Sequence, residues 1–439
     1  SFFGTLYLVI LSLIMVSCGG TDRMQQIKVL NWADYIDENV KNGFEQWYYE
    51  QTGEKIELVY ETFDINETAL TKIEVGHEDY DVFCPSEYII ERMFKKGLLL
   101  PIDKSIIPDS IYYFDNISPF VTDKFQQMAP TADITVSDYA VGYMWGTTGF
   151  IYNPQYVDVN ELQSWDAILN PKFENRILMK DAFRDVYSVL VLYAYRDQIA
   201  AGEVDRNELV HHVTAERVNA VKEVLLQAKN QICGWEVDFG KEEMTKGKAW
   251  LNLSWSGDAQ FAIEEASEMG VMLDYIVPKE GSNVWFDGWV IPKYAKNPKA
   301  ASYFINFLCK PENVIRNMDA IGYVSTVGGQ EILEGVEDPE SFEPINASYF
   351  FGEEADSVCV NPTMYPDKVI ITRCGMMHDG DTEQLLKMWS RVKGANASAW
   401  TYFIIFLFFG SLIFAVVFKY AKKRQRNRRS AKKRKNRKN

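Results

Sequence analysis

Cysteine and histidine are scarce in this chain of 439 residues, and several classes of site are missing with them. The six cysteines contain no CxxC pair, so a zinc ribbon or a thiol redox motif has no support. No HExxH, Walker A, GxSxG or GxGxxG motif occurs. The four histidines are His77, His211, His212 and His378. We therefore expect no metal, no cofactor and no enzyme activity.

Charged side chains are absent from residues 1–20 and 400–418, and residues 419–439 hold no acid at all. The latter segment carries 13 Lys and Arg residues, yet the whole chain has a net charge of −15. The residues in between are therefore strongly acidic. Such a body repels nucleic-acid backbones and attracts cations, although solubility alone would account for many of its carboxylates.

Residues 400–418 form an apolar run just long enough to cross a membrane as a helix, at about 1.5 Å per residue for a hydrocarbon core of roughly 30 Å. Trp400 and Tyr402 lie at one end of the run and the basic cluster at the other. The positive-inside rule places residues 419–439 in the cytoplasm and the acidic body outside. We expect a transmembrane helix in the cell membrane, with lipid as one partner.

Residues 1–20 are also apolar and end in Ser17, Cys18 and Gly19, which resembles the lipobox of bacterial lipoproteins. Cys18 is therefore a candidate for lipidation after a signal segment. The alternative is that this run ends a transmembrane helix of an upstream permease domain. Farther along, Cys359 and Cys374 could form a disulfide outside the cell.

The body begins with extended and helical patterns in alternation, which is typical of an α/β fold with a parallel sheet. We expect strands over 27–36, 55–62 and 80–86, and helices over 38–53 and 66–76. Ligands bind such sheets beyond the carboxyl ends of the strands. Trp32 and Ser86 fall at two of these ends.

Several motifs follow one another in a fixed order between residues 27 and 393. They include NWADYI (31–36), YDVFCPSEYII (80–90), YMWGTTGFIYN (143–153), WSGD (255–258) and WFDGWVIPKYAKN (285–297). In this order and spacing the chain resembles the periplasmic spermidine/putrescine-binding proteins of ABC importers. The resemblance implies a two-lobed α/β clamp with hinge crossovers, which captures a polyamine and delivers it to a membrane permease.

Two lobes also suit a chain of this length. We expect the first lobe to combine residues 27–142 with 285–322, and the second to combine 143–284 with 323–393. The extended, glycine-interrupted run from residue 138 to 153 is suited to cross between them. Closure by hinge bending would then trap the ligand.

A linear polyamine needs carboxylates for its ammonium groups and apolar walls for its methylenes, and an aromatic ring serves both needs. The resemblance and this chemistry together predict a site of six aromatic residues, four acids and one serine. These are Trp32, Tyr35, Tyr88, Trp255, Trp285 and Tyr323, then Asp34, Asp185, Asp258 and Asp287, and finally Ser86.

Local patterns support some of these residues more than others, because an ordinary Trp packs in a core. Trp285 and Asp287 are two positions apart, so on a strand they share one face. Trp255 precedes Ser-Gly-Asp, a turn-like sequence that would expose its ring. Tyr323 is expected at a lobe crossing. Asp34, in contrast, could simply be a helix N-cap.

The choice of polyamine is less constrained. Ala182 and Met377 replace polar positions that the resemblance associates with the longer ligand, which favours putrescine slightly over spermidine. A binding protein for a sugar or for iron is the main alternative, and a surface-anchored glycosidase a weaker one.

Overall fold

The computed structural model describes residues 22–237, 240–380 and 382–396. The segment 1–20 with Cys18, the predicted transmembrane helix over 400–418 and the basic tail over 419–439 lie outside these residues. Within the described part of the chain, no helix combines the length and the apolar character that a membrane crossing requires. The five cysteines in it, including Cys359 and Cys374, are free thiols, so the suggested disulfide is absent.

The first lobe opens with the predicted alternation. Its elements are β1 (Gln26–Trp32), α2 (Glu38–Thr52), β2 (Glu57–Phe63), α3 (Asn66–Glu74), β3 (Val82–Phe83) and α4 (Glu87–Lys95). β1 pairs in parallel with both β2 and β3. Helix α2 begins after Asp37, whose carboxylate accepts from the amides of Asn39 and Val40. The N-cap is therefore Asp37, and the suggestion of Asp34 for this role is wrong.

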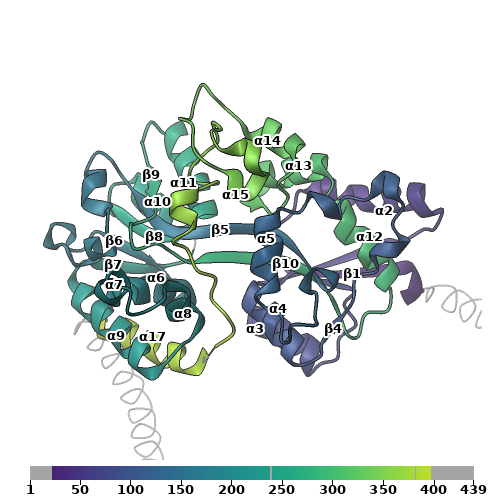
Figure 1. The fold of residues 1–439 in the computed structure, drawn as a ribbon, viewed down its shortest axis with the longest axis horizontal. Helices are drawn as coiled ribbons and strands as arrows, with labels where there is room; N and C mark the ends of the chain where they lie inside the picture. Colours follow the sequence, from purple (N-terminus) through teal and green to yellow (C-terminus); the bar gives the residue numbers. More distant parts are fainter. Residues whose placement is uncertain (1–21, 238–239, 381, 397–439) are drawn as a thin grey trace, which may run out of the picture.

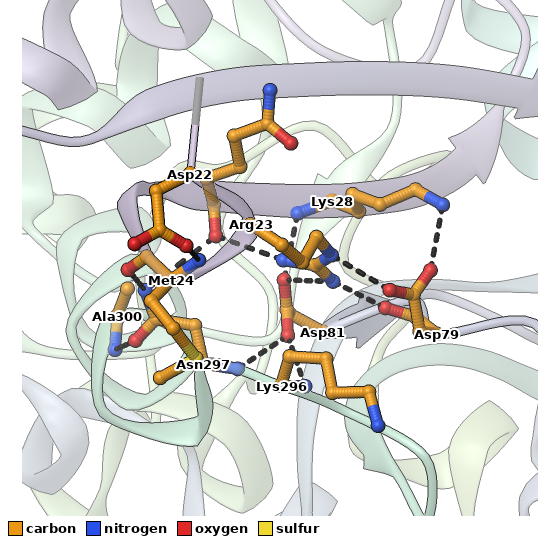
Figure 2. Close-up of polar contacts among 10 residues, drawn as sticks. Asp22, Arg23, Met24, Lys28, Asp79, Asp81, Lys296, Asn297 and Ala300 are labelled. Atoms are coloured by element: carbon orange, nitrogen blue, oxygen red, sulfur yellow. Dashed lines mark hydrogen bonds and ion pairs between the residues drawn. The ribbon is translucent and has the colours of Figure 1, made fainter. Parts of the chain in front are cut away.

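A buried carboxylate fixes the outer edge of this lobe (Figure 2). Asp81 is fully buried and accepts from the amides of Lys28, Lys296 and Asn297 at 2.7–2.9 Å. The guanidinium of Arg23 lies 2.9 Å from the same carboxylate. Asn297 in turn caps α12 (Pro298–Leu308). Asp81 thus joins the amino-terminal turn, β1 and α12, because a buried charge requires a full set of donors.

Two long strands cross the middle of the molecule and connect its two halves (Figure 1). They are β5 (Ala140–Tyr152) and β10 (Val284–Pro292), which pair antiparallel. The strand order is β2-β1-β3-β10-β5-β8-β6-β7. The sheet is therefore mixed, whereas the alternating pattern predicted a parallel one. The sheet departs from that pattern at the crossing strands, because β10 runs opposite to β3 of the first lobe and to β5, and β5 runs opposite to β8 of the second lobe.

The second lobe returns to parallel pairing, with β6 (Ile177–Lys180) between β7 (Ile232–Glu236) and β8 (Leu251–Trp255). The end of β5 pairs with β8 and with β9 (Asp274–Ile276). Its helices are α6 (Phe183–Ala194), α7 (Arg196–Ala200), α8 (Arg206–His211), α9 (Ala215–Gln227), α10 (Gly240–Thr245), α11 (Ser256–Glu268) and α17 (Thr382–Asn396). In Figure 1, α6 to α9 and α17 gather below this half of the sheet.

The remaining strands and α-helices belong to the first lobe. They are β4 (Leu99–Leu100), α5 (Pro119–Gln126), α13 (Pro311–Ile321), β11 (Val324–Ser325), α14 (Gln330–Val336), α15 (Ser348–Phe351) and α16 (Lys368–Ile371). β11 pairs with the first half of β5, and Phe350 stacks on Trp145 with centroids 5.2 Å apart.

The two hydrophobic cores divide the chain differently from the predicted lobes. Buried side chains between residues 324 and 376 pack in the first core, and those from 377 to 392 in the second. The prediction of 323–393 for the second lobe is therefore wrong over most of its length, because β11 adds to the first half of β5. The last crossing lies instead near Gly375, which exchanges backbone hydrogen bonds with Ser282 and Val284.

Candidate ligand-binding site

Eight of the eleven predicted residues are linked to one another where the two lobes meet. They are Tyr35, Ser86, Asp287 and Tyr323 on the first-lobe side, Asp185, Trp255 and Asp258 on the second-lobe side, and Trp285 on the crossing strand β10. Asp287 is 8% exposed and lies at a bulge of β10. Its carboxylate accepts from the hydroxyl groups of Tyr35 at 2.8 Å and Ser86 at 2.7 Å.

Aromatic rings continue from this carboxylate toward the second lobe. The ring of Tyr323 lies 5.5 Å from that of Tyr35 and 5.6 Å from that of Trp285. Trp285 in turn meets Trp255 edge-on at 6.4 Å. The hydroxyl group of Tyr323 donates to Asp258 at 2.6 Å. These four rings therefore form a row from Tyr35 to Trp255, in which the first ring is bonded to Asp287 and the second to Asp258.

Two glycines make room for this row. A Cβ atom on Gly146 would come within 2.5 Å of the ring of Trp285, and one on Gly257 within 2.5 Å of the ring of Tyr323. Both rings thus lie directly on backbone, which holds them in place without a side chain between.

The acids of the second lobe follow parallel strands, as the sheet rule predicts. Asp185 and Asp258 lie in the first turns of α6 and α11, directly after β6 and β8. The exposed amides and the dipole at a helix start stabilise an acid there. The Ser-Gly-Asp sequence after Trp255 is thus the start of a helix and not a turn. Asp185 also accepts from the amide of Asn283 at 2.7 Å.

Burial governs the electrostatics of the carboxylates that the two lobes contribute. Burial raises the pKa of Asp287 to about 6, against the lowering effect of Ser86 and Tyr35, and the charge of Asp185 adds to the rise. Burial also raises the pKa of Asp185, although Asn283 and Arg184 oppose it. Asp287 makes no salt bridge among the described residues. Two buried acids that repel each other favour a bound cation.

Tyr323 reaches this cluster by a route that its predicted position did not suggest. It follows Gly322, which ends α13 with φ 71°, and precedes β11 in the first lobe. The expectation of a lobe crossing at Tyr323 is therefore wrong. Its side chain nevertheless connects the two lobes, because its hydroxyl group donates to Asp258 of the second lobe.

Three predicted residues have other neighbours. Trp32 is half-buried and packs on Phe63 with ring centroids 4.4 Å apart. Asp34 is exposed, with a φ of 50°. Tyr88 donates to Glu67 at 3.1 Å and carries the guanidinium of Arg184 3.9 Å above its ring. As binding residues these three stay predictions.

Sequence inspection overlooked three polar side chains at the cluster. Asn283 binds Asp185, and its spacing of two from Trp285 was an available signal. Glu87 is 5% exposed and accepts from the amide of Phe286. Burial raises the pKa of Glu87 to about 8, opposed by Arg184. Lys180 lies at the end of β6. Its sequence position did not suggest a place in the site, because a site that binds cations was expected to contain acids and no lysine.

Comparisons with known proteins agree on one family. The model of the family described as bacterial extracellular solute-binding protein matches residues 44–329. The spermidine/putrescine-binding periplasmic protein of Salmonella typhimurium is 28% identical over 294 residues, 67% of this chain and 75% of that protein. The putrescine-binding periplasmic protein PotF of Escherichia coli is 28% identical over 329 residues, 72% and 81% of the respective chains.

A solved structure is similar over a longer stretch. It is the spermidine/putrescine ABC transporter substrate-binding protein PotD of Streptococcus pneumoniae, with 28% identity and a TM-score of 0.63. The match covers 85% of this chain and 100% of that one. The predicted two-lobed α/β clamp is thereby confirmed.

Proposed function

Because the chain belongs to the bacterial extracellular solute-binding proteins, we propose that it captures a polyamine between its lobes and presents it to the permease of an ABC importer. Proteins of this family are solute-binding proteins, and the chain is not an enzyme. The relatives whose names include a polyamine are similar over two thirds or more of the chain.

The observation that carries this proposal is the pair of buried carboxylates at Asp287 and Asp185. Neutral hydroxyl and amide groups donate hydrogen bonds to them, and the nearby charge of Arg184 offsets only part of the cost of burying Asp185. An uncompensated buried charge is costly, and a ligand ammonium would relieve that cost for both acids. Since the two come from different lobes, a cation between them also favours the closed arrangement.

The ring surfaces between the acids support an organic cation over the alternatives. Trp285, Trp255 and Tyr323 offer apolar walls for methylene groups and π faces for ammonium groups, each cation–π contact contributing about 0.5–2 kcal/mol. A neutral sugar would leave the buried acids unpaired. Within the described residues there is also no cluster of three or more His, Cys, Asp or Glu side chains suited to a metal ion.

Among polyamines, putrescine fits this proposal better than spermidine. Met377 is 3% exposed and packs in the second core, so it adds no polar contact for a longer ligand. Ala182 precedes α6 without a polar side chain. Beyond the acids named above, few polar groups along the row of rings could bind the additional amine of spermidine.

A ligand panel tests the function directly. The protein is expected to gain roughly 4 kcal/mol in its free energy of unfolding at about 1,000 times the dissociation constant of a true ligand. Thermal unfolding is measured with putrescine, spermidine, spermine, maltose and ferric citrate. Stabilisation by maltose or iron, with none by the polyamines, would contradict the proposal.

We extend the proposal to location. The relatives named above are periplasmic proteins. Residues 400–418 would tether this chain to the cell membrane with its acidic body outside and residues 419–439 in the cytoplasm, and Cys18 would add a lipid anchor. A tether holds the binding lobes near the permease at high effective concentration. Protease added to intact cells is expected to digest the body and spare an epitope on the tail, and the reverse pattern would refute this orientation.

A further inference from the structure

A lysine ammonium already occupies one end of the aromatic row. Lys180 ends strand β6, and its side chain is only 3% exposed. Its Nζ atom lies 4.5 Å from the centroid of the Trp255 ring. It also forms an ion pair with Asp258, lies 3.6 Å from the carboxylate of Glu236, and donates to the carbonyl oxygen of Val237.

These partners are the groups that an ammonium ligand requires. They comprise an aromatic face, two carboxylates and one carbonyl oxygen, gathered at the carboxyl ends of the parallel strands β6, β7 and β8. In the sheet, Lys180 and Glu236 are direct neighbours on β6 and β7. The fold therefore forms a complete ammonium position here and fills it with a side chain of its own.

This position is continuous with the proposed polyamine site. Asp258, which pairs with Lys180, also accepts from the hydroxyl group of Tyr323. The ring of Tyr323 contacts that of Tyr35, which donates to Asp287. A cavity of about 150 Å³ adjoins this end of the row and is lined by Glu236, Asp258 and Tyr323 among others. The Lys180 position thus lies at one end of the row, and Asp287 at the other.

We infer that Lys180 is a specificity-determining residue, because its ammonium takes the place of a third ligand ammonium and so makes the site select a diamine over a triamine. This inference rests on the proposed function. A triamine would have to bring its extra charge toward a position where Lys180 already neutralises the local acids. Two like charges in one buried position repel strongly. A diamine, in contrast, needs only the acids at Asp185 and Asp287.

The test compares the full-length protein with Lys180→Met, which keeps the length of the side chain and removes its charge. Lys180→Gln is the second variant, since its amide can still donate to Asp258 if the Met variant folds poorly. The matched control is Lys172→Met in the same lobe, where an exposed lysine pairs with Glu161 at 2.5 Å. Calorimetric titration gives the dissociation constants of putrescine and spermidine for each protein.

The wild type is expected to bind putrescine at least tenfold more tightly than spermidine. Lys180→Met is expected to change this ratio at least tenfold in favour of spermidine, with Lys180→Gln in the same direction and Lys172→Met without effect. An unchanged ratio in a folded Lys180 variant, or a wild type that already prefers spermidine, overturns the inference and leaves the proposed function intact. A wild type that binds no polyamine overturns both.

Discussion

Asp287→Asn is expected to weaken the binding of putrescine by about 100- to 1,000-fold. Asp287 is buried and accepts hydrogen bonds from the hydroxyl groups of Tyr35 and Ser86. It forms no ion pair with a basic side chain in the described structure, so its charge can pair with a ligand ammonium. Removing one partner of a buried charge pair costs about 2–5 kcal/mol, and every 1.4 kcal/mol is tenfold in the dissociation constant. Calorimetric titration of both proteins at pH 7 measures the loss.

The Asp287→Asn protein should remain folded in the absence of ligand. An amide can exchange hydrogen bonds with the two hydroxyl groups, and it removes a carboxylate whose burial is unfavourable. Asp197→Asn is the control, because it changes the net charge equally at a side chain that is 87% exposed. It tests whether overall charge alone attracts the ligand, and we expect less than about a twofold change. Normal affinity in a folded Asp287→Asn protein would remove this residue from the site.

The sequence was informative wherever the site follows from strand ends and strand periodicity. Ser86, Asp185 and Asp258 come directly after parallel strands, where the fold rule places ligand contacts. Trp285 and Asp287 share a strand at a spacing of two. Trp285 is one of the four rings, and Asp287 accepts from Tyr35, the ring at one end of the row. These are local patterns, so a single chain contains enough information to find them.

The rest depended on contacts between distant segments. Nothing near Tyr323 reveals that its hydroxyl group binds Asp258, 65 positions earlier in the chain. The short strand β11 assigns residues 324–376 to the first lobe through two register positions on β5, too few for a periodic signal. The sequence did not single out Lys180, because its role depends on its contacts with Trp255 and Asp258. Pairing of this kind becomes visible only in three dimensions.

The affinity for putrescine is expected to fall about 30-fold between pH 7 and pH 4.5. Burial holds the pKa of Asp287 at about 6, above its ordinary value of 3.8, so the free site is mostly protonated at the lower pH. The ligand ammonium, like that of lysine with an ordinary pKa near 10, stays charged throughout. Binding must then expel the proton from Asp287, which costs about 1.4 kcal/mol for each pH unit below 6.

The free protein should respond to pH with the opposite sign. A carboxyl group whose pKa is raised by folding stabilises the fold most at low pH, and this contribution is lost as pH rises through about 6. Glu87, with its pKa near 8, extends the loss to about pH 8. Urea unfolding and calorimetric titration across pH 4.5–8, with Asp287→Asn as the reference, separate the Asp287 contribution from all others. If wild type and variant show the same pH dependence of putrescine affinity, Asp287 does not titrate on binding. If the affinities of wild type and variant instead diverge only below pH 6, and putrescine binding releases a proton near pH 5, one buried carboxylate both binds the ligand and lowers the stability of the ligand-free protein.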